Sequence, residues 1–282
     1  MCADSGVQEV DTRGLYLYCL ARRGLPTGVL RFDDGVQHAP ERITYREVTG
    51  LVREEPVADW TGETGERNLR DLRWVGAQAG RHRKVLEAVS EYSPILPATL
   101  GTLFSERNVL LALIRQRHDS IVTFFDAVEG RDEWSLKIWL ERNKACNRLS
   151  EHENAEAVRR LESLPPGARY LQERRLREAG ESRVKDWMRD TCQVVVDELG
   201  AVATSFHQRK ILPSLKAETT GEMVLNGAFL VSRELVEEFH NLVEGLKPRL
   251  DPRGVSLTLS GPWPPYSFAP DLGNDHREME TA

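Results

Sequence analysis

The stretch Leu-Thr-Leu-Ser-Gly-Pro-Trp-Pro-Pro-Tyr-Ser-Phe-Ala-Pro, residues 257–270, begins as a strand and then changes character. Val255, Leu257 and Leu259 alternate with polar residues, which is the pattern of a strand with one buried face. Gly261 is then followed by three prolines within four residues. Because proline has no backbone donor and a fixed φ, we expect the strand ladder to stop there.

Three aromatic residues lie on this stiff segment: Trp263, Tyr266 and Phe268. Aromatic side chains bury large apolar areas, so one interpretation is a structural clasp that crosses a domain surface and seals it. The other interpretation is a pre-shaped aromatic ledge for a protein partner, because a stiff segment loses little entropy on binding. Both interpretations stay open at this point. The three residues are therefore the candidate partner interface.

The composition is ordinary for a globular protein: of 282 residues, 40% are hydrophobic and 29% are charged. This length suffices for one large or two ordinary domains. The net charge of -6 argues against a nucleic-acid partner, and no apolar run approaches the length that spans a membrane. The four cysteines are scattered singly and no secretory signal is visible, so we expect reduced thiols and a cytoplasmic protein.

After a flexible start at residues 1–13, residues 14–130 are predicted to form an N-terminal domain, a modified α+β sandwich. A Gly-containing loop is expected at residues 61–66. The expected strands cover residues 15–20, 29–32, 43–52 with a break near Gly50, and 95–100. The expected helices cover residues 66–92 and 105–117, with a third running to 128 after a turn at His118-Asp119-Ser120.

Residues 131–270 carry a second pattern, β-α-β-β-α-β. Its strands are expected at 133–140, 202–209, 223–231 and 255–260, and its helices at 168–199 and from Ser232 to Pro248, with a short additional helix at 153–164. This order is that of the ferredoxin-like sandwich, in which two helices cover one face of an antiparallel sheet. Residues 271–282 are polar and are expected to form a disordered tail.

Motifs of catalysis are absent from the sequence, which contains no nucleotide-binding glycine loop, no H-E-x-x-H, no G-x-S-x-G and no C-x-x-C. The histidines are dispersed, so spacing shows no metal set. His82 falls on the apolar face of its helix, where a core histidine with satisfied hydrogen bonds is a simpler explanation than a ligand. We therefore predict no catalytic residues, no cofactor and no metal, and a binding or assembly protein instead of an enzyme.

Several stretches together resemble the gas vesicle GvpL/GvpF family. The most specific is Ser-Gly-Pro-Trp-Pro-Pro-Tyr-Ser-Phe at 260–268, which follows Leu-Asn-Gly-Ala-Phe-Leu-Val at 225–231 and a helix with Phe239. Further landmarks occur in the family's order at 15–20, 79–86 with its His82, 95–104, 133–137 and 167–171. Ala98-Thr99-Leu100 departs from the family, which more often carries Arg-Phe before the Gly-Thr. The resemblance extends from about residue 14 to 270.

The resemblance implies two α+β domains, the second of them ferredoxin-like, and a minor protein that acts in forming the gas-filled shell of a gas vesicle. It also implies that the chain binds the small, very hydrophobic major shell protein and other accessory proteins, and that it is located in the cytoplasm or at the vesicle. Family members are not known as enzymes.

The resulting prediction is an assembly factor that acts like a chaperone or as a structural adaptor. A shell subunit must expose apolar surface and strand edges until it is polymerised. A partner can cover these by adding a strand or by offering an apolar, aromatic groove. The alternative is a ferredoxin-like regulatory module that binds a small ligand.

Overall fold

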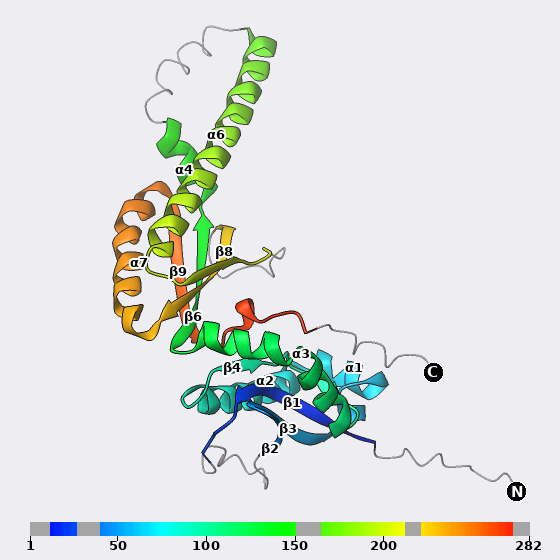
Figure 1. The fold of residues 1–282 in the computed structure, drawn as a ribbon. Coiled ribbons are helices and arrows are strands. Elements are labelled where there is room, and N and C mark those ends of the chain that lie inside the picture. The colour runs from blue at the N-terminus through cyan, green and yellow to red at the C-terminus, as the bar shows by residue number, and fades with distance from the viewer. Residues whose placement is uncertain (1–11, 27–39, 151–164, 212–220, 273–282) are drawn as a thin grey trace, which may run out of the picture. The chain divides into compact units, whose positions relative to one another are not determined.

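The chain is an α+β protein with two antiparallel sheets (Figure 1). The computed structural model describes residues 12–26, 40–150, 165–211 and 221–272. The strand expected at 29–32, the short helix at 153–164 and most of both expected flexible ends lie outside these residues. Within them, no helix is both long and apolar enough to cross a membrane.

Two compact units divide the chain. Unit 1 comprises Met1–Gly130 and Pro264–Ala282, and unit 2 comprises Arg131–Trp263. The chain passes from unit 1 to unit 2 between Gly130 and Arg131, which is also the boundary between the two expected domains. The residues after Trp263 differ from expectation, because they group with unit 1 and not with the C-terminal domain. A strand and the segment that follows it can belong to different units, since alternation along a strand does not show where the chain packs after it ends.

Unit 1 is built on a sheet with the strand order β2-β3-β1-β4, to which β5 adds by pairing with β1. Its strands are β1 (Arg13–Arg22), β2 (Glu41–Tyr45), β3 (Val48–Pro56), β4 (Ile95–Pro97) and β5 (Leu103–Phe104). β1 pairs with β3 on one side and with β4 and β5 on the other, which confirms its predicted central place. The break expected near Gly50 is instead the turn at Arg46, whose φ is +51°, while Gly50 lies inside β3.

The helices of unit 1 differ most from the sequence prediction. They are η1 (Val57–Asp59), α1 (Gly62–Arg70), α2 (Leu72–Ser90) and α3 (Arg107–Val128). The loop expected up to residue 66 is helical, and the helix expected over 66–92 is interrupted at Asp71. Asp71 caps α2 by accepting the Arg73 backbone N–H at 2.8 Å, and this cap starts a new helix axis. Leu72, the first residue of this new helix, is 85% exposed.

The turn expected at residues 118–120 is also absent, because α3 is one continuous helix. Ile114, His118, Ile121 and Phe125 are all buried at helical spacing, so the apolar face runs through the polar triplet. The imidazole of His118 lies edge-on to the Tyr45 ring, 5.9 Å between centroids. The packing face thus overrides the local turn signal.

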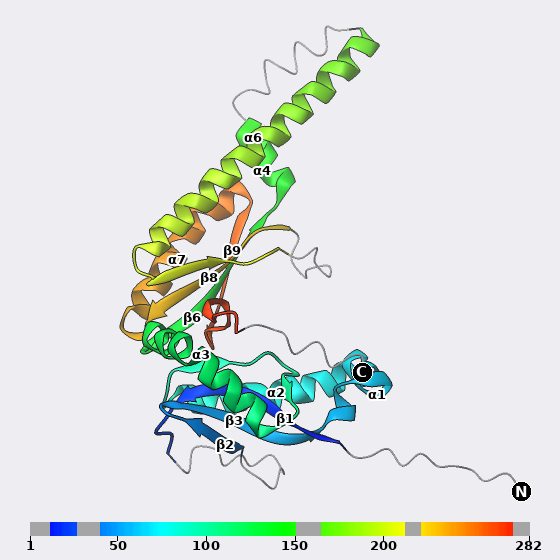
Figure 2. The same ribbon diagram turned by 45° about the vertical axis from the view of Figure 1, so that its right-hand side comes forward.

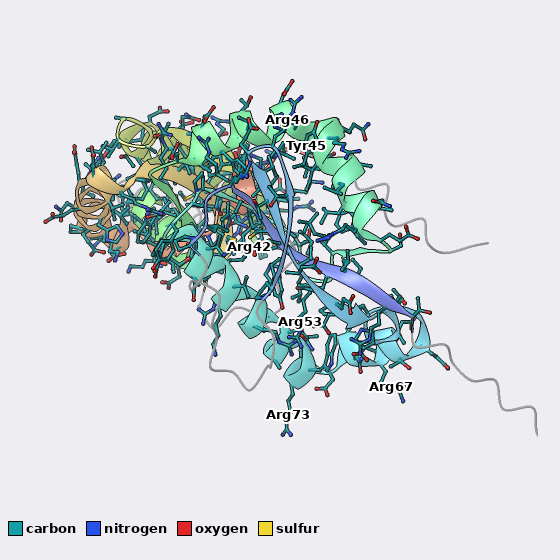
Figure 3. All side chains as sticks on the ribbon, turned by 60° about the horizontal axis from the view of Figure 1, so that its bottom comes forward. Arg42, Tyr45, Arg46, Arg53, Arg67 and Arg73 are labelled. Carbon is teal, nitrogen blue, oxygen red and sulfur yellow. The ribbon has the colours of Figure 1, made fainter. Side chains whose placement is uncertain are left out.

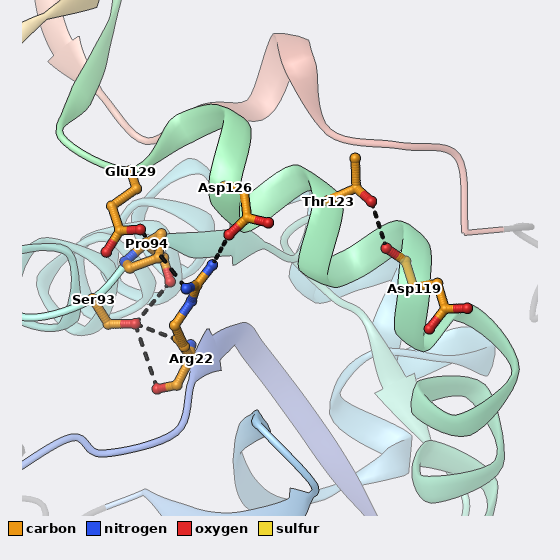
Figure 4. A network of polar contacts seen from close by, with 7 residues as sticks. All are labelled: Arg22, Ser93, Pro94, Asp119, Thr123, Asp126 and Glu129. Atoms are coloured by element: carbon orange, nitrogen blue, oxygen red, sulfur yellow. Dashed lines mark hydrogen bonds and ion pairs between the residues drawn. The ribbon is translucent and has the colours of Figure 1, made fainter.

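Helices cover both faces of the unit 1 sheet. A Cβ added at Gly50 of β3 would lie 3.2 Å from Leu110 Cδ2 of α3, whereas the neighbouring Leu51 belongs to a buried cluster with Val85 and Leu86 of α2. Successive residues of a strand face opposite sides, so α2 and α3 lie on opposite faces. Arg22 fastens the end of β1 to α3 by an ion pair with Asp126, next to Ser93 (Figure 4).

Unit 2 has the strand order β7-β8-β6-β9, with every neighbouring pair antiparallel. Its elements are β6 (Arg131–Leu140), α4 (Arg142–Ser150), α6 (Pro166–Gly200), β7 (Ser205–Gln208), β8 (Glu222–Ser232), η2 (Arg233–Leu235), α7 (Val236–Leu250), η3 (Asp251–Arg253) and β9 (Val255–Trp263). The predicted order of elements is present, with α4 added before α6. Pro248 lies inside α7 and does not end it, since the helix continues to the buried Leu250.

One face of the unit 2 sheet packs against α6 and α7. The core combines Leu136 and Ile138 of β6 with Val184 and Met188 of α6 and Phe239 of α7. The N-terminal part of α6 carries exposed apolar residues, Tyr170 and Leu171, and extends well past the sheet of its own unit (Figures 1 and 2). Only the second half of α6 is therefore a core helix.

The ladder between β9 and β6 does not stop at Gly261-Pro262, contrary to the prediction. The register shifts there, and pairing resumes with Trp263 opposite Glu133. β9 is an edge strand, where proline is tolerated because one side of the strand needs no partner. Gly261 has a φ of +151°, and a Cβ there would lie 2.8 Å from Trp134 Cε3, so only glycine fits this bulge.

Candidate binding grooves beside helix α6

The three residues predicted as a partner interface are divided between the two units. Trp263 ends β9 in unit 2, and its indole N–H donates to Ser260 Oγ at 3.3 Å. Tyr266 and Phe268 lie in η4 (Tyr266–Phe268), which groups with unit 1. Trp263 is 40% exposed and Tyr266 is 42% exposed, whereas Phe268 is half-buried. Intermediate exposure fits a clasp and a ledge equally, so both interpretations remain predictions.

His82 is a core histidine with satisfied hydrogen bonds, as the sequence indicated. Its Nδ1 lies 2.7 Å from the Tyr16 hydroxyl, and its Nε2 lies 3.1 Å from the Ala98 carbonyl oxygen. Burial lowers the pKa of His82 to about 4 and raises the pKa of Tyr16 well above its usual value. Both groups are neutral near pH 7, so Tyr16 donates to Nδ1 and Nε2–H donates to the carbonyl. Both ring nitrogens are occupied, which leaves none for a ligand.

Several arginines of unit 1, labelled in Figure 3, serve its own fold. Arg42 donates to the carbonyl oxygens of Leu25 and Pro26 at 2.8 and 2.7 Å. Arg53 lies 3.4 Å from the buried carboxylate of Glu55, and Arg46 lies over the Tyr45 ring. These contacts already use the guanidinium groups, so this face offers a weaker case for an anionic partner than its arginine content suggests.

The second half of α6 separates two grooves in unit 2. Val184, Met188, Val195 and Leu199 form its buried core face. Cys192 and Val196 turn toward the strand edge on one side, and Trp187 and Val194 turn toward α7 on the other. The sequence shows these residues as one broad apolar face, which is wider than a single packed contact needs. This extra width of the apolar face is the feature of the sequence that indicates the grooves.

The first groove, called here the sheet-edge groove, has a volume of about 560 Å³ and lies between α6 and the beginning of β8. Its apolar lining includes Met188 and Val196 of α6, Phe206 of β7, Ile211 and Met223. Cys192 also lines it, and burial raises the pKa of this thiol to about 11. The thiol is protonated at neutral pH, so it contributes apolar surface and not a nucleophile.

An incompletely paired strand borders the sheet-edge groove. β7 has four residues and pairs with Gly227–Leu230 of β8, after which Arg209 N donates to the Asn226 carbonyl at 2.8 Å. β6 pairs with β8 over its whole length on the other side. In the described parts of the chain, no strand pairs with the β7-facing edge of residues 222–225. Such an edge presents backbone donors and acceptors to an incoming strand.

Gly227 allows the aromatic ring of Phe206, which forms one wall of this groove, to lie close to the β8 backbone. A Cβ at Gly227 would lie 2.7 Å from Cε2 of Phe206, so the ring of Phe206 packs directly over the strand backbone. The Phe206 ring also contacts Phe229, with 4.8 Å between centroids. Gly227, within the apolar run of β8, therefore has a packing role.

The second groove, called here the α6–α7 groove, consists of two adjoining cavities of about 490 and 390 Å³ that share Trp187 and Arg253. Leu246 and Leu250 of α7 form part of its floor. Three arginines lie at its rim: Arg148, Arg249 and Arg253. Among the described residues, no group of His, Cys, Asp and Glu side chains could hold a metal ion.

Fold and grooves together define the class, a two-unit α+β protein with apolar grooves on either side of α6. The chain belongs to the GvpL/GvpF family, because residues 14–270 match the family model described as gas vesicle synthesis protein GvpL/GvpF. Gas vesicle protein L of Streptomyces sp. strain CB03234 is 31% identical over 276 residues, which cover 95% of this chain and 97% of that protein.

Solved structures of relatives share the fold. The crystal structure of gas vesicle protein GvpF from Anabaena sp. PCC7120 matches with a TM-score of 0.66 at 22% identity, covering 92% of this chain and 96% of that one. GvpF from Microcystis aeruginosa matches with a TM-score of 0.62 at 21% identity, covering 91% and 99%. Membership in the family implies a role in gas vesicle formation. Neither the family description nor the relatives' names indicate a catalytic activity.

Proposed function

We propose that this chain acts in gas vesicle assembly by binding the hydrophobic major shell protein, in a chaperone-like manner or as an adaptor to other accessory proteins. The observation that carries the proposal is the sheet-edge groove, where an apolar wall lies beside a strand edge that no strand of the described residues pairs with. The proposed setting is the cytoplasm, at the growing vesicle. We also propose that unit 2, with the strand order β7-β8-β6-β9, is a ferredoxin-like domain.

The chemistry of the groove supports an extended apolar segment as its occupant. Residues 222–225 offer backbone hydrogen bonds, which a strand satisfies at a regular repeat. Met188, Phe206 and Met223 offer adaptable apolar contacts for alternate side chains of that strand. A shell subunit has unpaired edges until it polymerises, and capping one of them would delay aggregation.

The test is light scattering of the shell protein diluted from denaturant, with and without an equal molar amount of this chain. Ile211 is 41% exposed in the sheet-edge groove and Val194 is 48% exposed in the α6–α7 groove, so aspartate at either position should be tolerated by the fold. Wild type and Val194→Asp should suppress scattering and co-elute with the shell protein. Ile211→Asp should do neither. Equal suppression by all three chains would show that the shell protein binds at a surface other than the sheet-edge groove. Suppression by none of them would reject shell-protein binding.

The aromatic segment is a second proposed contact for the same partner. Replacing Trp263, Tyr266 and Phe268 together by alanine distinguishes the two interpretations of that segment. Loss of cooperative folding would support the clasp. Retained folding with weaker binding of the shell protein would support the ledge, and no change in either property would reject both.

The alternative proposal is a regulatory module that binds a small ligand. Its support is the size of the sheet-edge groove, about 560 Å³, which lies in the range of small-molecule sites. A ligand that raises the melting temperature of wild type but not of Ile211→Asp would favour this alternative. The same ligand would then be expected to compete with an extended apolar peptide.

A further inference from the structure

We infer that the α6–α7 groove is a second docking site, which takes an acidic amphipathic helix from a protein partner. This inference goes beyond shell-protein binding, because it concerns the opposite side of α6 and a different kind of segment. It rests on the shape of the groove, on the charges at its rim and on the exposed apolar residues between them.

The groove has the shape that a helix fills. On α6, Trp187, Thr191 and Val194 recur at steps of four and three residues. On the other side, Leu246 and Leu250 of α7 lie one turn apart and form the floor, and Arg253 follows in η3 after α7 has ended. The three α6 residues form a straight ridge along their helix, and this ridge and the α7 floor beside it border a channel into which a third helix can pack. Seven residues of helix span about 10 Å, so two turns of a partner helix are in contact.

The rim favours a negatively charged occupant. Three arginines and one aspartate, Asp190, line the groove, in a chain whose net charge is -6. Asp190 already lies 3.1 Å from Arg189, and Arg249 lies 3.0 Å from Glu198. Arg148 donates to the Pro252 carbonyl at 3.2 Å. Arg253 has no ion pair within the described residues, so a carboxylate of the partner would meet it directly.

The floor supplies the apolar half of the match. Leu246, Leu250 and Val195 are buried beneath the groove, while Val194 is exposed and Trp187 is half-buried beside it. Tryptophan and arginine are the residues most often found as energetic centres of protein interfaces. A partner helix would place its apolar stripe on Trp187 and Val194 and its acidic flank toward Arg253. This groove presents helix side chains and no strand edge, which distinguishes it from the sheet-edge groove.

The test uses the full chain and two fluorescein-labelled peptides of about four helical turns. Both peptides carry leucine at i, i+3, i+4 and i+7; one has glutamate at the remaining positions and the other has lysine. Fluorescence anisotropy should show binding of the acidic peptide, weakened by salt, and much weaker binding of the basic one. Arg253→Glu and Val194→Asp should weaken binding of the acidic peptide by at least about tenfold.

Ile211→Asp is the matched control, and it should bind the acidic peptide as wild type does. Circular dichroism and thermal unfolding of each variant should match wild type, since Arg253, Val194 and Ile211 are all exposed. Equal binding of both peptides, no binding of either, or an Arg253→Glu variant that binds like wild type would overturn the inference. A lower mass of Arg253→Glu than of wild type in light scattering would also overturn it, because a second copy would then be the occupant.

Failure here is distinguishable from failure of shell-protein binding. The shell-protein assay depends on Ile211 and is indifferent to Val194, whereas the peptide assay has the opposite dependence. A chain that passes one assay and fails the other therefore assigns a function to one groove only.

Discussion

Two buried polar contacts, one against the sheet of each unit, are of opposite electrical kinds. Unit 1 buries a neutral pair, Tyr16 and His82, joined at 2.7 Å. Unit 2 buries the carboxylate of Glu133, which is 1% exposed and forms an ion pair with Arg209. The neutral pair lies wholly in the interior, whereas the guanidinium of the charged pair keeps part of its surface in water. A charge is costly to bury, so the cation that remains hydrated makes the buried carboxylate tolerable.

The largest expected effect comes from breaking the charged pair. Arg209→Met removes the cation that faces buried Glu133 and should lower the free energy of unfolding by about 3 to 5 kcal/mol. The double variant Glu133→Gln/Arg209→Met should lose less, because no carboxylate is then buried beside an apolar side chain. Urea denaturation followed by tryptophan fluorescence measures both. A double variant less stable than Arg209→Met alone would show that Glu133 is held mainly by other contacts.

The second prediction concerns how the free energy of unfolding depends on pH through His82 of the neutral pair. The pKa of His82 is about 4 in the folded chain, against about 6.5 in the unfolded chain. Between these values the unfolded chain binds a proton that the folded chain does not, so stability falls as pH falls from about 6.5 to 4. The loss is at most about 3 kcal/mol. His118 acts in the opposite direction, because Asp119 and Glu47 raise its pKa and its contribution is lost as pH rises.

His82→Gln tests this assignment, since glutamine offers an acceptor to Tyr16 and a donor to the Ala98 carbonyl but does not titrate. The variant should keep most of the stability at pH 7 and lose the decline toward pH 4. Urea denaturation at pH 7 and pH 4.5 gives the comparison. An unchanged decline in the variant would place its origin in other groups.

The sequence predicted the strands better than it predicted the breaks between elements. Leu15–Leu20 and Trp134–Leu140 carry their apolar pattern in the residues themselves, and both form central strands. Asp71 starts a helix that the sequence pattern does not predict, because one capping aspartate competes with an apolar periodicity that continues past it. His118 is the reverse case, in which the periodicity prevails over a polar triplet that suggests a turn.

The grooves could not be predicted, because they depend on lengths and on packing between distant elements. Within the described residues, the edge of β8 extends past β7 because β7 has four residues and β8 has eleven, and no local pattern compares the two lengths. The position of the aromatic segment also depends on contacts between elements that are distant in the sequence. Tyr266 and Phe268 follow directly on a unit 2 strand, yet their contacts group them with unit 1. Which surface a proline-rich segment lies on is decided by tertiary contacts and not by alternation.

The third prediction breaks the neutral pair of unit 1. Tyr16→Phe leaves Nδ1 of His82 without its donor while preserving the ring contacts with Trp60 and Tyr18. The expected loss is about 1 to 3 kcal/mol, the cost of a buried polar atom without a partner. The double variant Tyr16→Phe/His82→Leu removes both polar groups and should recover part of this loss. If it is less stable than Tyr16→Phe, the packing of the imidazole contributes more than its hydrogen bond.

The smallest effect should come from Ser135, the neutral neighbour of the charged pair. Its hydroxyl lies 3.1 Å from Nη1 of Arg209 and is buried beside Glu133. Ser135→Ala should cost about 1 kcal/mol in wild type, because one hydrogen bond to a charged group is lost and no charge is left behind. In the Arg209→Met background the same substitution should cost almost nothing, since its partner is already absent. A full cost in both backgrounds would mean that Ser135 stabilises the strand itself, and that the ion pair does not depend on it.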